Sequence, residues 1–309
     1  MSFYPDRSES ELNTFIPKAI CYGNNKYHGQ DYQECYQNGA VTAIVQADGT
    51  TLTRTTWRSQ NGRIIPELLK DGPFPNAIHS GSASKAGVGA GLKIVEAWEK
   101  RREEVLTSQL NVGVYPWYGL YENIVSFLEQ YPNRTYLGNS TLGIIAFNQE
   151  TNKILYGGVG NQAVWLIFRN GKAIKLPFGN FDKGNFIGPF ISSPTYAIHS
   201  KANIEDSRSF KLKEFDLRSF ANDIEQGCAP AIVTDGFLLY IESVAVIDTE
   251  RSAVADIMRR VSLDTENCLM ESVNERAMLT GDDTHLGIII IKPFEQHTYL
   301  RKLMIADGT

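Results

Sequence analysis

The sequence TLGIIAFNQETNKILYGGVGNQAVWLIFRNGKAIKL, residues 141–176, indicates the fold class. It contains apolar segments of strand length in close succession, at 141–147, 153–157, 163–169 and 173–176. The dipeptide Asn170-Gly171 before the last segment is typical of a tight hairpin turn. Short connections join antiparallel strands, because a parallel crossover needs a much longer connection. The stretch therefore predicts an antiparallel meander.

The rest of the chain adds both strands and helices. Runs of β-branched and other apolar residues predict further strands at 18–22, 41–47, 231–234 and 285–291. Apolar residues at helical spacing predict helices at 84–106, 118–130, 250–261 and 265–278. Strands are grouped with strands and helices with helices, which favours an α+β fold over regular βαβ alternation. No repeat, charge block or low-complexity segment divides the sequence, which predicts a single domain over residues 1–309.

Two segments have no clear period. Residues 50–82 are polar, interrupted by Gly and Pro, and longer than most loops, which predicts a functional flap or an insertion. Residues 177–201 are loop-like and rich in Gly, Phe and Pro, as expected of a flap-like loop. Substrate recognition is expected in these two segments.

Composition excludes several classes of protein. The chain has 30 Lys and Arg against 35 Asp and Glu, a net charge of −5, so a basic nucleic-acid binder is not expected. The apolar run at 286–291 is far too short to span a membrane, and the N-terminus lacks the pattern of a signal peptide. We therefore expect a cytoplasmic protein without nucleic-acid or membrane partners. The sequence leaves the oligomeric state open.

The four cysteines are Cys21, Cys35, Cys228 and Cys268. They are scattered, with no CxxC pair and no neighbouring histidine in a metal-ligand pattern. This spacing predicts free thiols in a reducing compartment, and neither disulfides nor a zinc site.

Aspartates occur repeatedly where an apolar strand meets a turn. Asp48 follows the strand 41–47, Asp235 follows 231–234, and Asp282-Asp283 precede 285–291, while Asp31 precedes another candidate strand. A carboxylate at a buried strand end is costly unless it is paired or bound to metal. Each Asp-Gly alone has a simpler explanation as a turn, but several sites together suggest a centre for hard divalent cations.

In order and strand context, these residues resemble the metal-dependent protein serine/threonine phosphatases of the PP2C type, the PPM family. The chain is identified as a divergent member over about residues 18–292. The similar motifs are Gly29-Gln30-Asp31, Ala47-Asp48-Gly49, Asn139-Ser140-Thr141-Leu142, Val159-Gly160-Asn161-Gln162-Ala163, Thr234-Asp235-Gly236 and Asp282-Asp283.

The resemblance implies a four-layer αββα sandwich, in which helices flank two antiparallel β-sheets. It also implies hydrolysis of phosphoserine or phosphothreonine on a phosphoprotein substrate, through a water activated by two Mg²⁺ or Mn²⁺ ions per chain. Asp48, Asp235 and Asp282 would hold one ion. Asp48 and the carbonyl of Gly49 would hold the other, and Asp31 would act through bound waters.

The chain also departs from the family pattern. Lys26 stands where many members have a phosphate-binding Arg, and it could equally be an ordinary solvated lysine. The usual histidine general acid is missing; His28 or His285 could replace it, although most isolated histidines have no catalytic role. Asn161 replaces an Asp that helps to hold a third metal, so that site should be weak or lost. These departures favour an alternative, a pseudophosphatase that binds a partner or ligand.

Overall fold

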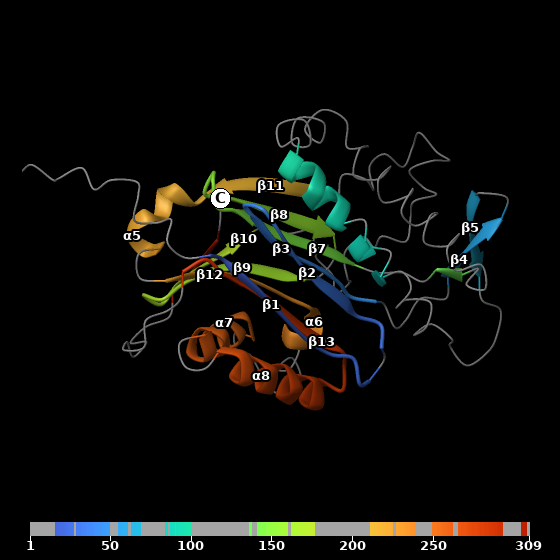
Figure 1. Ribbon diagram of the computed structural model, residues 1–309. Coiled ribbons are helices and arrows are strands. Elements are labelled where there is room, and N and C mark those ends of the chain that lie inside the picture. The colour runs from blue at the N-terminus through green and yellow to red at the C-terminus, as the bar shows by residue number, and fades with distance from the viewer. Residues whose placement is uncertain are drawn as a thin grey trace, which may run out of the picture.

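The computed structural model describes residues 16–27, 29–49, 55–60, 63–68, 84–85, 87–89, 91–100, 136–137, 141–159, 162–176, 211–224, 227–238, 249–261, 265–292 and 304–307 (Figure 1). The expected helix at 118–130 and the loop at 177–201 lie outside these residues, as do positions 101–106 of the first expected helix. None of the described helices is both long and apolar enough to cross a bilayer.

A five-stranded antiparallel sheet forms one central layer. Its strand order is β11-β8-β7-β3-β2. The inner strands β3 and β7 are buried along their whole length, which explains their continuous apolar sequence. Its strands are β2 (Tyr32–Asn38), β3 (Val41–Ala47), β7 (Leu142–Asn148), β8 (Lys153–Val159) and β11 (Lys211–Asp216).

A six-stranded sheet forms the second central layer, in the order β1-β13-β12-β9-β10-β14. All of its pairs are antiparallel except β10 with β14, which is parallel and was not expected. Its strands are β1 (Lys18–Asn24), β9 (Ala163–Phe168), β10 (Lys172–Leu176), β12 (Cys228–Val233), β13 (Thr284–Ile290) and β14 (Met304–Asp307).

The predicted meander is therefore divided between two sheets. β7 and β8 pair in the five-stranded sheet, whereas β9 and β10 pair in the six-stranded sheet. The reason is burial: Ile145 of β7 and Leu166 of β9 lie in one hydrophobic core, which forms only when the two sheets pack face to face. Each hairpin was predicted correctly, but their continuity was not.

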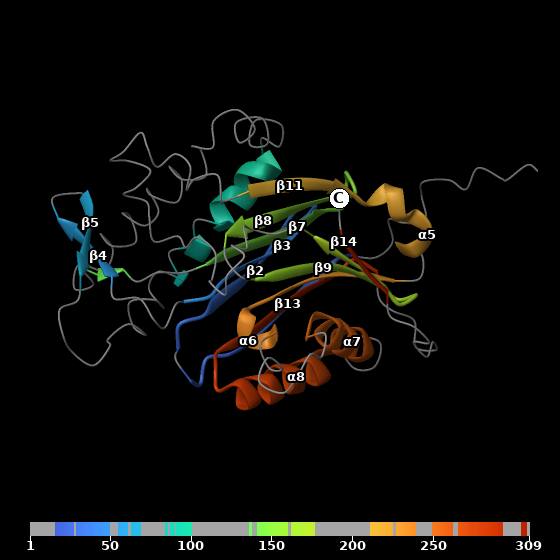
Figure 2. The ribbon, with the colours of Figure 1, turned by 180° about the vertical axis from the view of Figure 1, so that it is seen from behind.

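Helices cover both outer faces of this pair of sheets. A second core joins Trp165 of the six-stranded sheet to apolar residues of α6 (Asp235–Leu238), α7 (Thr249–Val261) and α8 (Thr265–Thr280). On the opposite side, the helix at 91–100 packs on the five-stranded sheet, where the buried Trp98 donates from Nε1 to Glu214 at 3.1 Å. Figures 1 and 2 show these helices on opposite sides of the sheets, so the αββα sandwich is confirmed.

The segment 50–82 is more regular than its sequence indicated. β4 (Thr55–Gln60) and β5 (Arg63–Leu68) pair as a hairpin, and β4 also pairs with β6 (Tyr136–Leu137). The interpretation of 50–82 as irregular is therefore wrong over these strands.

Two short helices, η3 (Leu217–Phe220) and α5 (Ala221–Ile224), follow β11.

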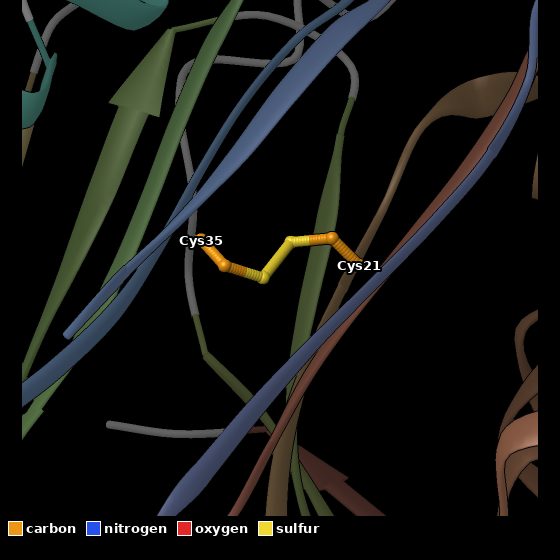
Figure 3. The surroundings of a disulfide bond; sticks show 2 residues. All are labelled: Cys21 and Cys35. Atoms are coloured by element: carbon orange, nitrogen blue, oxygen red, sulfur yellow. A yellow bond between two sulfur atoms is a disulfide. The ribbon is translucent and has the colours of Figure 1, made fainter.

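The prediction of four free thiols is also wrong. Cys21 of β1 and Cys35 of β2 form a disulfide, which links the two sheets (Figure 3). Strands β1 and β2 belong to different sheets, and only the packing of the sheets brings the sulfur atoms together. Cys228 and Cys268 are free, as predicted.

Candidate metal centre

Three aspartates converge from three strand ends. Asp31 immediately precedes β2, Asp48 immediately follows β3, and Asp235 follows β12 as the first residue of α6. The side chain of Asp48 is hydrogen-bonded to the side chains of both Asp31 and Asp235. The convergence that the sequence predicted is therefore present for these three carboxyl groups.

The electrostatics of this cluster favour protonation when no cation is bound. Burial raises the pKa of Asp31 well above its usual value, the hydrogen bond from Asp48 opposes this, and Asp235, Asp283 and Asp282 raise it further. Burial also raises the pKa of Asp48, and the charges of Asp235 and Asp31 add to the effect. The nearby charges that raise both pKa values are all carboxylates, so a proton or a cation must hold them together.

Hydrogen bonds fix the main chain around Asp48. Its N–H donates to Thr141 Oγ1 at 2.9 Å, and its carbonyl accepts from the Thr141 N–H at 2.8 Å. Gln162 Nε2 donates to the same Thr141 hydroxyl oxygen at 2.7 Å. The following Gly49 is buried and donates its N–H to Asp31 Oδ1 at 3.3 Å. The ends of β3 and β7 thus set the position of Asp48 and link it to Asp31.

The two aspartates before β13 have different environments. Asp283 is only 2% exposed; its Oδ2 accepts from the Gln30 N–H at 2.8 Å and its Oδ1 from the Tyr27 N–H at 3.2 Å. Asp282 is more exposed, and its Oδ1 accepts from the Asp283 N–H at 2.9 Å. Asp283 thus holds the backbone ahead of Asp31, and both Asp283 and Asp282 add their charge to the acidic cluster.

Gly236 allows the Asp235 turn to approach this loop. A Cβ at position 236 would lie 2.1 Å from the main-chain oxygen of Asp283. No side chain can occupy that space without a backbone shift, so the Thr234-Asp235-Gly236 sequence has a steric reason. Behind it, Arg276 of α8 donates to the Phe237 carbonyl at 2.8 Å, which ties α6 to α8.

His285 is less suited to catalysis than the sequence suggested. His285 is 3% exposed, and burial lowers its pKa to about 4, so it is neutral at physiological pH and unsuited to protonate a leaving group. Lys26 is exposed, in the turn ahead of Asp31. His28 and Asn161 lie outside the described residues.

Sequence reasoning missed several polar residues that support the cluster. Asn25 donates from Nδ2 to the Asp31 carbonyl at 3.0 Å, and Asp283 and Thr141 hold backbone groups on either side of the site. Asp283 and Thr141 stood in recognised motifs without an assigned role, but the role of Asn25 has no local sequence signal, because its partner His285 is 260 residues away.

Within the described part of the chain, no group of three or more His, Cys, Asp or Glu side chains could hold a metal ion as it stands. The residue types nevertheless suit Mg²⁺ or Mn²⁺, which bind carboxylate and carbonyl oxygens and keep several waters. The raised pKa values of Asp31 and Asp48 are a further fit, because a dication would replace the protons that these buried groups otherwise retain.

Comparison with known proteins supports the fold. No family model matches the chain, and no curated protein matches it in sequence. Among solved structures, a C. elegans sex-determining protein has a TM-score of 0.52 at 9% identity, over 90% of this chain and 65% of that chain. A bacterial serine phosphatase variant has a TM-score of 0.50 at 11% identity, over 90% and 100%.

The PP2C phosphatase domain of SpoIIE from Bacillus subtilis is also similar, with a TM-score of 0.49 at 12% identity, over 92% of this chain and 65% of that chain. The chain therefore shares its fold with the C. elegans protein and with the bacterial serine phosphatase variant, and the αββα fold that the sequence motifs implied is confirmed.

Proposed function

We propose that the protein is a Mg²⁺- or Mn²⁺-dependent phosphatase of the PP2C type that hydrolyses phosphoserine or phosphothreonine on proteins. One observation carries the proposal: Asp31, Asp48 and Asp235 form a hydrogen-bonded carboxyl cluster where the strand ends of both sheets meet. In a fold shared with serine phosphatases, such a cluster is suited to bind divalent cations.

The residues divide into ligands and supports. Asp48, Asp235 and Asp282, with the Gly49 carbonyl, would hold two ions, and Asp31 would act through bound waters. When bound, two such ions lower the pKa of a water and neutralise phosphoryl oxygens. Thr141 holds the backbone of Asp48, and the Gly49 N–H orients Asp31, so the carboxylates are fixed before the ions arrive.

Lys26 and His28 would act on the substrate in this proposal. The exposed Lys26 would attract the phosphate as a point charge, without the two-pronged hydrogen bonding of an arginine. His28 would serve as the general acid that protonates the leaving oxygen.

A pseudophosphatase is the second candidate. The observation in its favour is His285, whose pKa near 4 and whose hydrogen bond to Asn25 Oδ1 at 2.7 Å remove it from acid catalysis. Such a protein would keep the acidic cluster and bind a partner or ligand without efficient turnover.

Turnover of p-nitrophenyl phosphate, with and without Mn²⁺, separates the two. We expect activity that requires Mn²⁺ and is lost in Asp235→Ala. Asp216→Ala is the matched control, because Asp216, the last residue of β11, pairs with Arg218 at the surface. A phosphothreonine peptide should then be hydrolysed in preference to its phosphotyrosine counterpart. No turnover at any Mn²⁺ concentration, with Mn²⁺ binding intact, would favour the pseudophosphatase.

A further inference from the structure

The segment between β1 and β2, residues 25–31, carries Asp31 into the acidic cluster. The start of β13 holds it, because Asp283 accepts the N–H groups of Tyr27 and Gln30. Gly29 turns the chain with φ of 66°, a conformation that favours glycine. These contacts set the path of the segment but leave the main-chain carbonyl of Asp31 itself to another partner.

That partner is Asn25. Its Nδ2 donates to the Asp31 carbonyl at 3.0 Å. A carbonyl can only accept, so the amide nitrogen of Asn25 must face Asp31, and the amide oxygen must face the other way. There, at 2.7 Å, stands Nε2 of His285. Since the Asn25 oxygen can only accept, Nε2 must carry the proton.

His285 is rigidly held in that orientation. Its side chain is buried. Its main-chain N–H donates to Thr234 Oγ1 at 2.9 Å, and its main-chain carbonyl accepts from the Thr234 N–H at 3.1 Å. The ring fills the space that a side chain at Gly23 would need, because a Cβ there would lie 2.6 Å from the ring. His285 Nδ1 has no hydrogen-bond partner among the described residues. Within them, the hydrogen bond of the His285 ring is therefore the one to Asn25.

We propose that Asn25, oriented by the Nε2–H group of His285, is a positioning residue that holds Asp31 at the candidate metal centre. The chain of contacts runs from His285 through Asn25 to the main chain of Asp31, whose Oδ1 accepts the Gly49 N–H and whose carboxyl group contacts Asp48. The role in catalysis rests on the proposed function, whereas the positioning of Asp31 does not.

Four variants test the proposal. Asn25→Ala removes both hydrogen bonds, and His285→Leu removes the donor to Asn25. His285→Gln keeps an N–H donor near the place of Nε2. Asn274→Ala is the control, because it removes the bond of 2.8 Å that Asn24 Nδ2 donates to Asn274 Oδ1, one residue from Asn25 and away from Asp31. Melting temperatures identify any variant that fails to fold. If His285→Leu fails to fold, Asn25→Ala still tests the proposal.

Two measurements report on Asp31. The first is hydrogen exchange at the Gly49 amide in the metal-free protein, followed by NMR, because this N–H donates to Asp31 Oδ1. The second is the dissociation constant for Mn²⁺, measured by calorimetry with the metal alone. We expect Asn25→Ala and His285→Leu to speed the exchange and to weaken Mn²⁺ binding about 10- to 100-fold, the usual cost of losing such a supporting contact. His285→Gln and Asn274→Ala should resemble the unaltered protein.

The proposal is wrong if Asn25→Ala leaves both measurements unchanged, or if His285→Gln is as damaging as His285→Leu. Its failure is distinct from failure of the proposed function. If the unaltered protein binds Mn²⁺ but hydrolyses no phosphate ester, the proposed phosphatase activity is refuted and the positioning of Asp31 by Asn25 is not. If the unaltered protein binds no Mn²⁺, hydrogen exchange at the Gly49 amide alone tests whether Asn25 positions Asp31.

Discussion

Reduction of the Cys21–Cys35 disulfide should lower the free energy of unfolding by about 3 kcal/mol. The two cysteines are 14 residues apart in sequence, and a cross-link that closes a loop of this length removes about 3 kcal/mol of chain entropy from the unfolded state. For a chain of 309 residues, this corresponds to a fall in melting temperature of roughly 5 °C. Cys35 is exposed and Cys21 partly so, which gives a dithiol reductant access.

The assay combines thiol counting with thermal melting. Protein denatured without reductant should show the two free thiols of Cys228 and Cys268, and all four cysteines should react after treatment with dithiothreitol. Cys35→Ser should melt like the reduced protein and should not respond to reductant. Cys268→Ser is the matched control: it lacks a free thiol and should keep the full response. Four reactive thiols in the untreated protein, or Cys35→Ser melting at the original temperature, would refute the reasoning.

Three further predictions concern pH, close packing and metal stoichiometry. The pKa of His285 is lowered from 6.5 to about 4, so the unfolded chain takes up a proton in this range and the folded protein does not. The contribution of His285 to the free energy of unfolding is therefore complete above pH 6.5 and falls as the pH drops, by about 2.5 kcal/mol at pH 4.5. Urea unfolding at pH 7.5 and 4.5 should show this decrease. A decrease equally large in His285→Gln would contradict the prediction. Gly236→Ala should destabilise the protein by about 1–3 kcal/mol in urea unfolding, because its Cβ would meet the Asp283 main-chain oxygen. Gly89→Ala has open space and should be neutral or stabilising, and equal losses in the two variants would contradict the steric argument. Calorimetry should find at most two tightly held Mn²⁺ per chain, with a weaker third binding event added in Asn161→Asp, because Asn161 would offer an uncharged amide oxygen where the similar motif of the PP2C-type phosphatases has a carboxylate. Three equivalent ions in the unaltered protein would contradict this prediction.

The sequence alone determined the elements whose signal is local. The apolar runs of β7, β9 and β13 and the periodic helices α7 and α8 could be recognised because burial imposes a pattern on consecutive residues. β2 and β11 gave weaker signals, because polar residues interrupt both edge strands. The positions of Asp31, Asp48 and Asp235 were found for the same local reason, since each lies beside a strand end.

Only the tertiary structure decided how these pieces meet. The assignment of β8 and β9 to different sheets and the Cys21–Cys35 bond depend on two sheets closing over one core. The Asn25–His285 contact depends on the pairing of β1 with β13, two strands that lie far apart in the sequence. The different environments of the adjacent Asp282 and Asp283 have the same origin, because the partners of Asp283 are Tyr27 and Gln30, at the other end of the chain. Hydrophobic burial leaves a pattern along the sequence, whereas a hydrogen bond between distant residues leaves none, because its geometry exists only after the strands have paired and the chain has folded.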